Sequence, residues 1–304
     1  MQFAGVIFSG MNKDEFTTRA GELQALADRA VEKTLADFAD KRLTAKQLAI
    51  TVVDLQRADQ PVSAGYRQVE PTYPASIVKM FYLAAAHRWM EDGRLADTAE
   101  LRRAMKDMIV DSGNEATAYV LDVLSGTTSG PELSPVEMAQ WIERREAVNR
   151  YFAAQGYTGI NVSKKTWWEG PYGRDQQVLE EYKSPRNFLT TEATARLLAE
   201  IATGKCVTAK RSEEMMALLK RDQTRTDNAD RQATEFIGPA LPADAKLWSK
   251  GGWMSAVRHD AAYVELPNGA KFVLVIFTAG HSEKKDLIAA VARPIVEGFG
   301  TGRF

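Results

Sequence analysis

The sequence predicts an α/β fold in which strands from both ends of the chain form one antiparallel sheet, flanked by helices and carrying an inserted all-helical domain. Apolar, β-branched segments occur near the N-terminus, at 48–55, and near the C-terminus, at 261–278. The chain between them has helical apolar spacing almost throughout. Pairing the terminal strands closes such a chain most simply. We therefore expect a discontinuous sheet domain (residues 1–73 plus 236–304) and a helical domain (residues 74–235), with the active site at their interface.

The N-terminal part predicts a helix and two strands. Between Asp14 and Asp40, apolar residues recur at helical intervals and define one buried face. Leu48–Leu55 is apolar and rich in β-branched residues, which is typical of a strand. The segment 61–69 follows a turn sequence at Gln60-Pro61, so we expect it to pair with that strand.

The C-terminal part predicts three further strands and a closing helix. The first strand is expected at 245–249. The segments 261–266 and 271–278 read as a hairpin, because Pro267-Asn268-Gly269 between them is a strong turn sequence. A helix is expected to follow, at about 282–297.

Composition and charge are those of a soluble globular protein. Of 304 residues, 45% are hydrophobic and 26% charged, and the formal net charge is -1. A nucleic-acid partner would call for a basic face, so none is expected. No run approaches the roughly 18 apolar residues of a membrane span. The apolar stretch Ala4–Phe8 is short and lacks the basic leader of an ordinary secretory signal.

Cysteine and histidine content argues against a metal site. Cys206 is the single cysteine, which excludes an internal disulfide and a thiolate cluster. His87, His259 and His281 are too few and too scattered for zinc. No phosphate-binding loop is apparent, so we expect neither a metal nor an organic cofactor.

The first candidate catalytic feature is PASIVKM, residues 74–80. A helix that begins at the serine places Ser76 and Lys79, three residues apart, on one face. A serine hydroxyl needs a base to take its proton, and a lysine can be that base when burial lowers its pKa. The helix dipole would also stabilise an oxyanion at this N-terminus.

This spacing alone is weak evidence, because S-x-x-K is expected about once by chance in a chain of this length. A second copy, Ser282 to Lys285, also follows a strand and opens a helix. Further motifs follow Ser76 only. We therefore interpret Ser282 as an ordinary helix N-cap.

Two more features follow Ser76. The sequence DSGN, residues 111–114, precedes a helix, and on the simplest explanation Ser112 or Asn114 caps it. The sequence KGG, residues 250–252, ends a predicted strand. Its glycines would let a ligand approach the backbone while the lysine presents a cation. The simpler explanation is a strand terminus with a glycine turn.

The order of the three motifs resembles the signature of penicillin-binding proteins and class A β-lactamases. Three longer segments extend the resemblance. They are 108–118 around the second motif, 187–204, which is similar to the helix after the family's omega loop, and 250–260 with its Arg-His-Asp. The resemblance covers roughly residues 47–296 and implies a β-lactamase/transpeptidase-like fold.

The resemblance implies a role for each motif residue. Ser76 would be the acylated nucleophile and Lys79 its general base. Ser112 would pass a proton to the leaving nitrogen, and Asn114 would donate to a substrate amide. Lys250 would attract the substrate carboxylate.

The oxyanion hole would consist of the backbone N–H groups of Ser76 and Trp253, with Gly252 of the third motif beside them. Arg258 falls where the family often has a second carboxylate-binding cation. Gly251 replaces a usual threonine or serine, whose hydroxyl would contribute about 1.5–3 kcal/mol as a hydrogen bond to a charged group. Gly113 replaces a usual aspartate.

The omega loop departs further from the family. Class A enzymes carry a glutamate there that activates the deacylating water. Trp168-Glu169 supplies the corresponding pair, but Gly173 stands where an asparagine is expected. Glu169 is our candidate base, with a purely structural acid as the alternative and Glu180 or Glu181 as substitutes.

Three functions remain open at this stage. The first is a class A-like β-lactamase, acylated at Ser76 and hydrolysed by water activated at Glu169. The second is a peptidase or esterase of the penicillin-binding type, and the third is a non-catalytic acyl acceptor. The expected partner is a small β-lactam or peptide-like acyl substrate, bound by a monomer. The family is usually exported, but no signal peptide is visible, so the compartment is left open.

Overall fold

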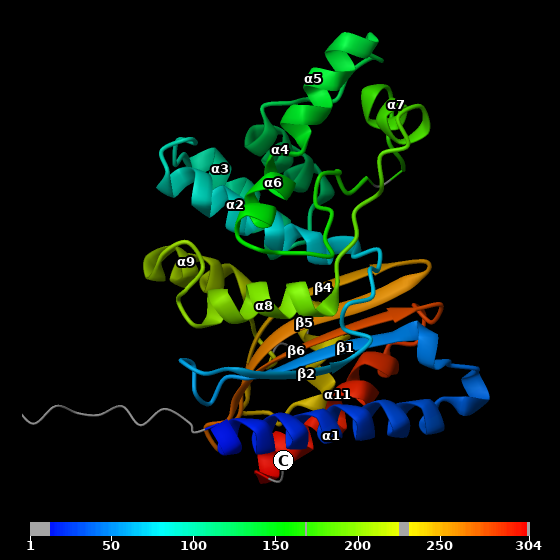
Figure 1. Ribbon diagram of the computed structural model, residues 1–304, viewed down its shortest axis with the longest axis vertical. Coiled ribbons are helices and arrows are strands. Elements are labelled where there is room, and N and C mark those ends of the chain that lie inside the picture. The colour runs from blue at the N-terminus through cyan, green and yellow to red at the C-terminus, as the bar shows by residue number, and fades with distance from the viewer. Residues whose placement is uncertain (1–12, 168, 225–230, 303–304) are drawn as a thin grey trace, which may run out of the picture.

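The computed structural model describes residues 13–167, 169–224 and 231–302. Within them, six strands form one antiparallel sheet in the order β2-β1-β6-β5-β4-β3 (Figure 1). The N-terminal strand β1 lies between β2 and the C-terminal strand β6, so the predicted pairing of the chain's two ends is confirmed. The strands are β1 (Leu48–Asp54), β2 (Val62–Tyr66), β3 (Lys220–Arg221), β4 (Lys246–Met254), β5 (Val257–Glu265) and β6 (Lys271–Ala279).

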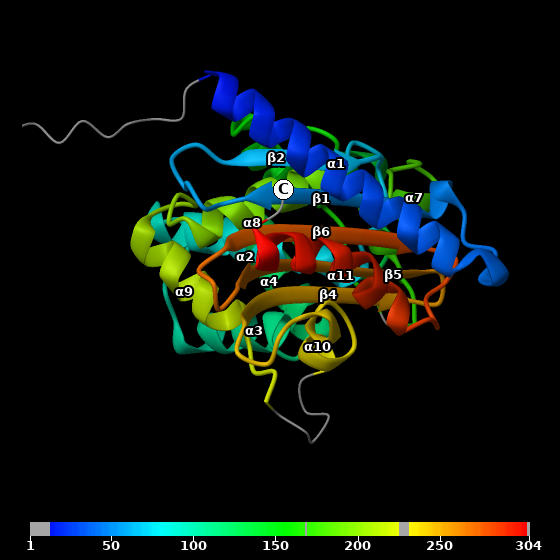
Figure 2. The same cartoon turned by 90° about the horizontal axis from the view of Figure 1, so that it is seen from below.

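Helices cover both faces of the sheet. On one face, α1 and α11 pack against the strands and against each other (Figures 1 and 2). On the other face, α8 lies directly on the sheet, and α2 to α7 lie beyond it (Figure 1). The helices are α1 (Lys13–Asp37), α2 (Lys79–Glu91), α3 (Ala99–Ile109), α4 (Asn114–Ser125), α5 (Pro135–Arg145), α6 (Ala147–Ala154), α7 (Arg174–Glu180), α8 (Thr191–Ala202), α9 (Ala209–Leu219), α10 (Arg231–Thr234) and α11 (Asp286–Thr301).

The two-sided cover explains why the central strands are apolar throughout. Side chains alternate between the faces of a strand, so a strand covered on both faces needs an unbroken apolar run. In β1, Ile50 and Val52 pack in the core with α1 and α11, whereas Ala49 and Val53 pack in the core with α2 and α8. Every residue of β1 is buried.

The apolar run after Ser76 forms α2, the central helix of the core on the side of the sheet that α8 covers. Met80 to Ala86 are all fully buried, so this helix is enclosed on every side. None of the described helices combines the length and the apolar character needed to cross a bilayer.

The structure corrects several sequence expectations. The Lys-Gly-Gly motif does not end a strand, because β4 continues to Met254 and pairs along its whole length with β5. The two-residue strand β3, for which we expected only helix, pairs with β4. Ser282 is not a helix N-cap, because α11 begins at Asp286. The Ser282 hydroxyl instead donates to the carbonyl of Ser255, 2.6 Å away.

Candidate active site

Ser76 lies in a short 3₁₀ turn, Ala75–Val78, that leads directly into α2. The preceding residue, Ala75, has a φ of 46°, in the left-handed region that alanine seldom adopts. The Ile77 N–H donates to the carbonyl of Pro74 at 3.1 Å and closes the turn. Such strained backbone is held only where its surroundings fix it, and it is concentrated at functional sites.

Lys79 follows one helical turn later and is completely buried. Its ammonium donates to the carbonyl of Ser112 at 2.5 Å, to Oδ1 of Asn114 at 2.9 Å and to Oγ of Ser112 at 3.3 Å. Burial lowers the pKa of Lys79 to about 7, although the charge of Glu115 acts in the opposite direction. A large fraction of Lys79 is therefore neutral near pH 7 and able to accept a proton.

Ser112 occupies the loop between α3 and α4, with a φ of 58°. The N-cap of α4 is Gly113, and no side chain caps this helix. The helix-capping explanation of Ser112 and Asn114 is therefore wrong. Both side chains point to lysines instead: Asn114 to Lys79, and Ser112 to Lys79 and Lys250.

Lys250 reaches the same serine from β4. Its ammonium lies 3.0 Å from Oγ of Ser112, 2.7 Å from the carbonyl of Gly251 and 3.1 Å from Oε1 of Gln232. Lys250 is also completely buried. The structure thus joins Lys79, Ser112 and Lys250 in one hydrogen-bonded network, although the three come from distant parts of the chain.

Gly252 of β4 lies directly against the backbone of Ser76. A Cβ atom built on Gly252 would lie 2.9 Å from the backbone N of Ser76 and 3.1 Å from that of Ile77. Side chains do not tolerate such contacts with backbone atoms, so only glycine lets β4 pass this close to the turn. The backbone N–H of Ser76 therefore lies beside β4.

Along the edge of β4 that faces away from β5, two side chains form hydrogen bonds with backbone groups. Arg221 donates to the carbonyl of Ser249, at 3.0 and 2.7 Å, and Gln232 accepts from the N–H of Gly251 at 2.9 Å. Alternate residues of a strand point their backbone groups to the same edge. The N–H of Trp253, two residues beyond Gly251, therefore points from this edge, as an oxyanion donor would have to do. That role stays a prediction.

Arg258 lies on β5 opposite Trp253. Its guanidinium donates to the carbonyls of Ser282, at 2.9 Å, and Glu235, at 3.2 Å, and it stacks over the ring of Phe236. The residue is 3% exposed. Its proposed binding of a substrate carboxylate stays a prediction.

Glu169 is exposed. Among the described residues, its side chain has no hydrogen-bond or ion-pair partner. Its neighbour Trp168 lies outside them. The glycine at 173 has a physical reason: with a φ of 51°, its Cβ would lie 2.0 Å from the carbonyl oxygen of Gly130. An asparagine therefore cannot occupy this position. The role of Glu169 stays a prediction.

Sequence reasoning missed two buried amides, Gln232 and Asn187. Oδ1 of Asn187 accepts from the N–H groups of Ser163 and Lys164, at 3.1 and 2.9 Å. Its Nδ2 donates to the carbonyl of Lys164 at 2.8 Å and to the Tyr82 hydroxyl of α2 at 3.2 Å. Asn187 therefore ties the two ends of the Glu169 loop, at residues 163–164 and at 187, to each other and to Tyr82 of α2. An isolated Asn or Gln in a sequence carries no signal for such a role.

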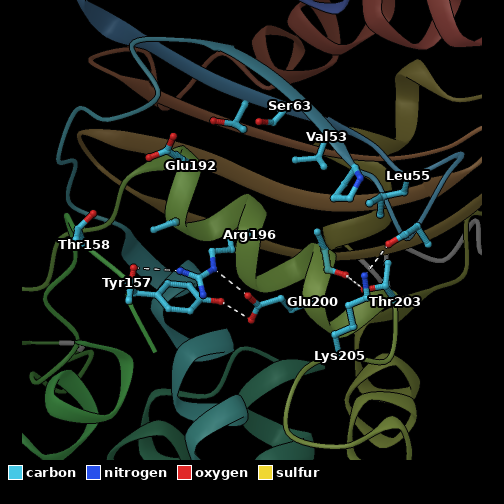
Figure 3. Close-up of a pocket in the computed structure, with 16 residues that line it drawn as sticks. Val53, Leu55, Ser63, Tyr157, Thr158, Glu192, Arg196, Glu200, Thr203 and Lys205 are labelled. Atoms are coloured by element: carbon cyan, nitrogen blue, oxygen red, sulfur yellow. Dashed lines mark hydrogen bonds and ion pairs between the residues drawn. The ribbon is translucent and has the colours of Figure 1, made fainter. Parts of the chain in front are cut away.

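A separate cavity of about 460 Å³ lies between α8 and strands β1 and β2. Figure 3 shows Glu200 beside Arg196 and Tyr157: Glu200 accepts from Arg196 at 2.8 Å and from the Tyr157 hydroxyl at 2.7 Å. None of the motif residues lines this cavity. Over the described parts of the chain, no group of His, Cys, Asp and Glu side chains could hold a metal ion.

Comparisons with known proteins found matches both to a family profile and to solved structures. The sequence matches the profile of the beta-lactamase enzyme family over residues 30–299. No curated protein sequence matches the chain.

Similar solved structures share the fold at low sequence identity. A β-lactamase from Sphaerobacter thermophilus is 18% identical, with a TM-score of 0.65, over 91% of this chain and 98% of that one. The protein PBP-A is 16% identical, with a TM-score of 0.62, over 92% and 97%. A β-lactamase from Xanthomonas campestris is 17% identical, with a TM-score of 0.65, over 88% and 98%.

The contact at Gly252 generates the first prediction. Gly252→Ala should lower the free energy of unfolding by about 1–3 kcal/mol, the usual range for overpacking, because the new methyl group would press on the backbone of Ser76. Gly21→Ala is the control. Gly21 is exposed within α1, and a Cβ there would meet no atom within 4 Å, so alanine should raise stability by about 0.5–1 kcal/mol through its better helix propensity. Denaturant unfolding measures both. Equal stability of the two variants would show that β4 does not press against the turn.

Proposed function

We propose that this chain, which belongs to the beta-lactamase enzyme family, is a serine hydrolase acylated at Ser76 by β-lactams or related amides. One observation carries the proposal: a buried lysine with a pKa near 7 follows Ser76 by one helical turn and shares Ser112 with a second buried lysine. Lys79, Ser112 and Lys250 form a hydrogen-bonded series that offers a base, a hydroxyl proton and a positive charge, which are groups that amide cleavage needs.

The first step is attack of the Ser76 hydroxyl on the carbonyl carbon of the amide. Neutral Lys79 takes the hydroxyl proton as the oxygen–carbon bond forms. The negative charge that develops on the carbonyl oxygen is stabilised by the N–H groups of Ser76 and Trp253. Donors held in place before the reaction need no reorganisation, which makes such stabilisation effective.

The second step is expulsion of the amide nitrogen. The carbon–nitrogen bond breaks, and the nitrogen takes a proton from the Ser112 hydroxyl, which is replaced by one from the Lys79 ammonium. The 3.3 Å contact between Lys79 and Oγ of Ser112 supports this transfer. Lys250, 3.0 Å from the same oxygen, supplies positive charge for an anionic substrate.

Release of the acyl group would require a base that activates water, and Glu169 is the candidate. Its exposed position favours slow release, because a water with few fixed partners is poorly placed, and misplacement can lower a rate on the order of 10²-fold. Among the described residues, the hydrogen bonds of Lys79 go to carbonyl, hydroxyl and amide oxygens, and none to a carboxylate. In the described parts of the chain, therefore, no carboxylate is hydrogen-bonded to Lys79, where it could activate a deacylating water. This favours, as a second candidate function, a penicillin-binding protein that holds its acyl group.

Mass spectrometry of the protein mixed with a penicillin tests this proposal. The parent should gain the mass of one intact penicillin on the peptide that contains Ser76, and the adduct should persist after free penicillin is removed. Ser76→Ala should gain none, whereas Ser282→Ala, which lacks the hydroxyl of the other S-x-x-K sequence, should label as the parent does. Labelling of Ser76→Ala would exclude Ser76 as the nucleophile. Complete loss of the parent's adduct within the mixing time would favour an efficient β-lactamase.

The rate of acylation should depend on pH through Lys79. Its pKa of about 7 makes the neutral base scarce at pH 6 and predominant at pH 8, so the rate should rise about tenfold between them. Lys79→Arg, which stays charged in this range, should acylate far more slowly and without that rise. Rates measured by stopped-flow or quenched mass spectrometry give the profile. A rate that is flat or falls as the pH rises would exclude Lys79 as the base.

A further inference from the structure

Gln232, in the short helix α10, is a buried amide with all of its hydrogen-bonding positions occupied. Its Oε1 accepts from the N–H of Gly251 at 2.9 Å and from the ammonium of Lys250 at 3.1 Å. Its Nε2 donates to the carbonyls of Ile109 at 3.2 Å and Val110 at 2.9 Å. The residue is 6% exposed. A side-chain amide offers two acceptor and two donor positions, so none is left unused.

The four partners also fix which way the amide faces. A backbone N–H and an ammonium can only donate, and backbone carbonyls can only accept. The amide oxygen must therefore face β4, and the amide nitrogen must face the end of α3. No other residue type offers two acceptor and two donor positions at this length.

These contacts connect the two sides of the candidate site. Ile109 ends α3 and Val110 begins the loop that carries Ser112, and Lys250 reaches Ser112 from the sheet. Gln232 holds both, so it fixes the ammonium of Lys250 relative to the hydroxyl of Ser112. It also occupies the N–H of Gly251, so the next N–H on this edge of β4 is that of Trp253.

We propose that Gln232 is a positioning residue that sets selectivity for anionic substrates by holding Lys250 at Ser112. This inference rests on the proposed acylation of Ser76. Gln232→Leu removes an acceptor from Lys250 and leaves the N–H of Gly251 and two carbonyls without this partner. Gln232→Glu keeps the size and the acceptors, but its charge offsets that of Lys250 and its carboxylate faces two carbonyls. Gln232→Leu lets the ammonium of Lys250 move away from Ser112, and Gln232→Glu offsets its charge, so both should weaken the attraction for a substrate carboxylate.

The test compares second-order acylation rates for a penicillin and for its methyl ester, which lacks the negative charge. The ratio of the two rates should fall about tenfold or more in Gln232→Leu and Gln232→Glu, measured on folded protein. Gln223→Leu is the matched control, because Gln223 donates to the carbonyl of Ala245 at 2.8 Å and does not contact Lys250. Its ratio should equal that of the parent. An unchanged ratio in folded Gln232 variants, with only a lower melting temperature, would overturn the inference.

Amide hydrogen exchange at Gly251, followed by NMR, tests the geometry without any substrate. Exchange should be at least tenfold faster in Gln232→Leu than in the parent, and unchanged in Gln223→Leu. Equal exchange in the parent and Gln232→Leu would show that Gln232 does not cover this N–H and would overturn the inference. A parent that no β-lactam acylates would overturn the proposed function, and the role of Gln232 with it. An acylated parent whose selectivity ignores Gln232 would overturn the inference alone.

Discussion

Two buried lysines meet at Ser112, and the arrangement of the site follows from that meeting. An ammonium removed from water is costly unless hydrogen-bond acceptors replace the lost water. Lys79 finds them in the carbonyl of Ser112 and the amide of Asn114, and Lys250 finds them in the hydroxyl of Ser112 and the amide of Gln232. The left-handed backbone of Ser112 lets one residue present both its carbonyl and its hydroxyl to lysines. Burial that would otherwise only destabilise the fold thereby supplies a lysine base with a pKa near 7.

Much of the fold could be predicted because the strands are covered on both faces. An unbroken apolar strand such as Leu48–Asp54, and a hairpin with Pro267-Asn268-Gly269 at its turn, produce strong local patterns. The errors came where tertiary contacts overrule local signals. The glycines of β4 read as a strand end, but β5 pairs with them and the turn at Ser76 requires their lack of side chains. The strand β3 is two residues long and exists only by pairing with β4.

The candidate site was predictable to the extent that it consists of ordered motifs. The sequence order of Ser76, Ser112 and Lys250 pointed to one site, and the structure places Ser112 and Lys250 in direct contact. Gln232 and Asn187 could not be predicted, because each acts through partners far away in the sequence and belongs to no motif. The strain at Ala75 was equally hidden, since alanine does not normally mark a left-handed backbone.

The most direct test of the site's central interaction is the acylation rate of Ser112→Gly. Glycine suits the backbone φ of 58° and keeps the carbonyl that Lys79 needs, so this variant removes the hydroxyl without strain. If the hydroxyl passes the proton to the leaving nitrogen, the rate of adduct formation at Ser76 with a penicillin should fall at least about 10²-fold in protein that stays folded, within the usual range for a general acid. Acylation at the parent's rate in stably folded Ser112→Gly would contradict the account.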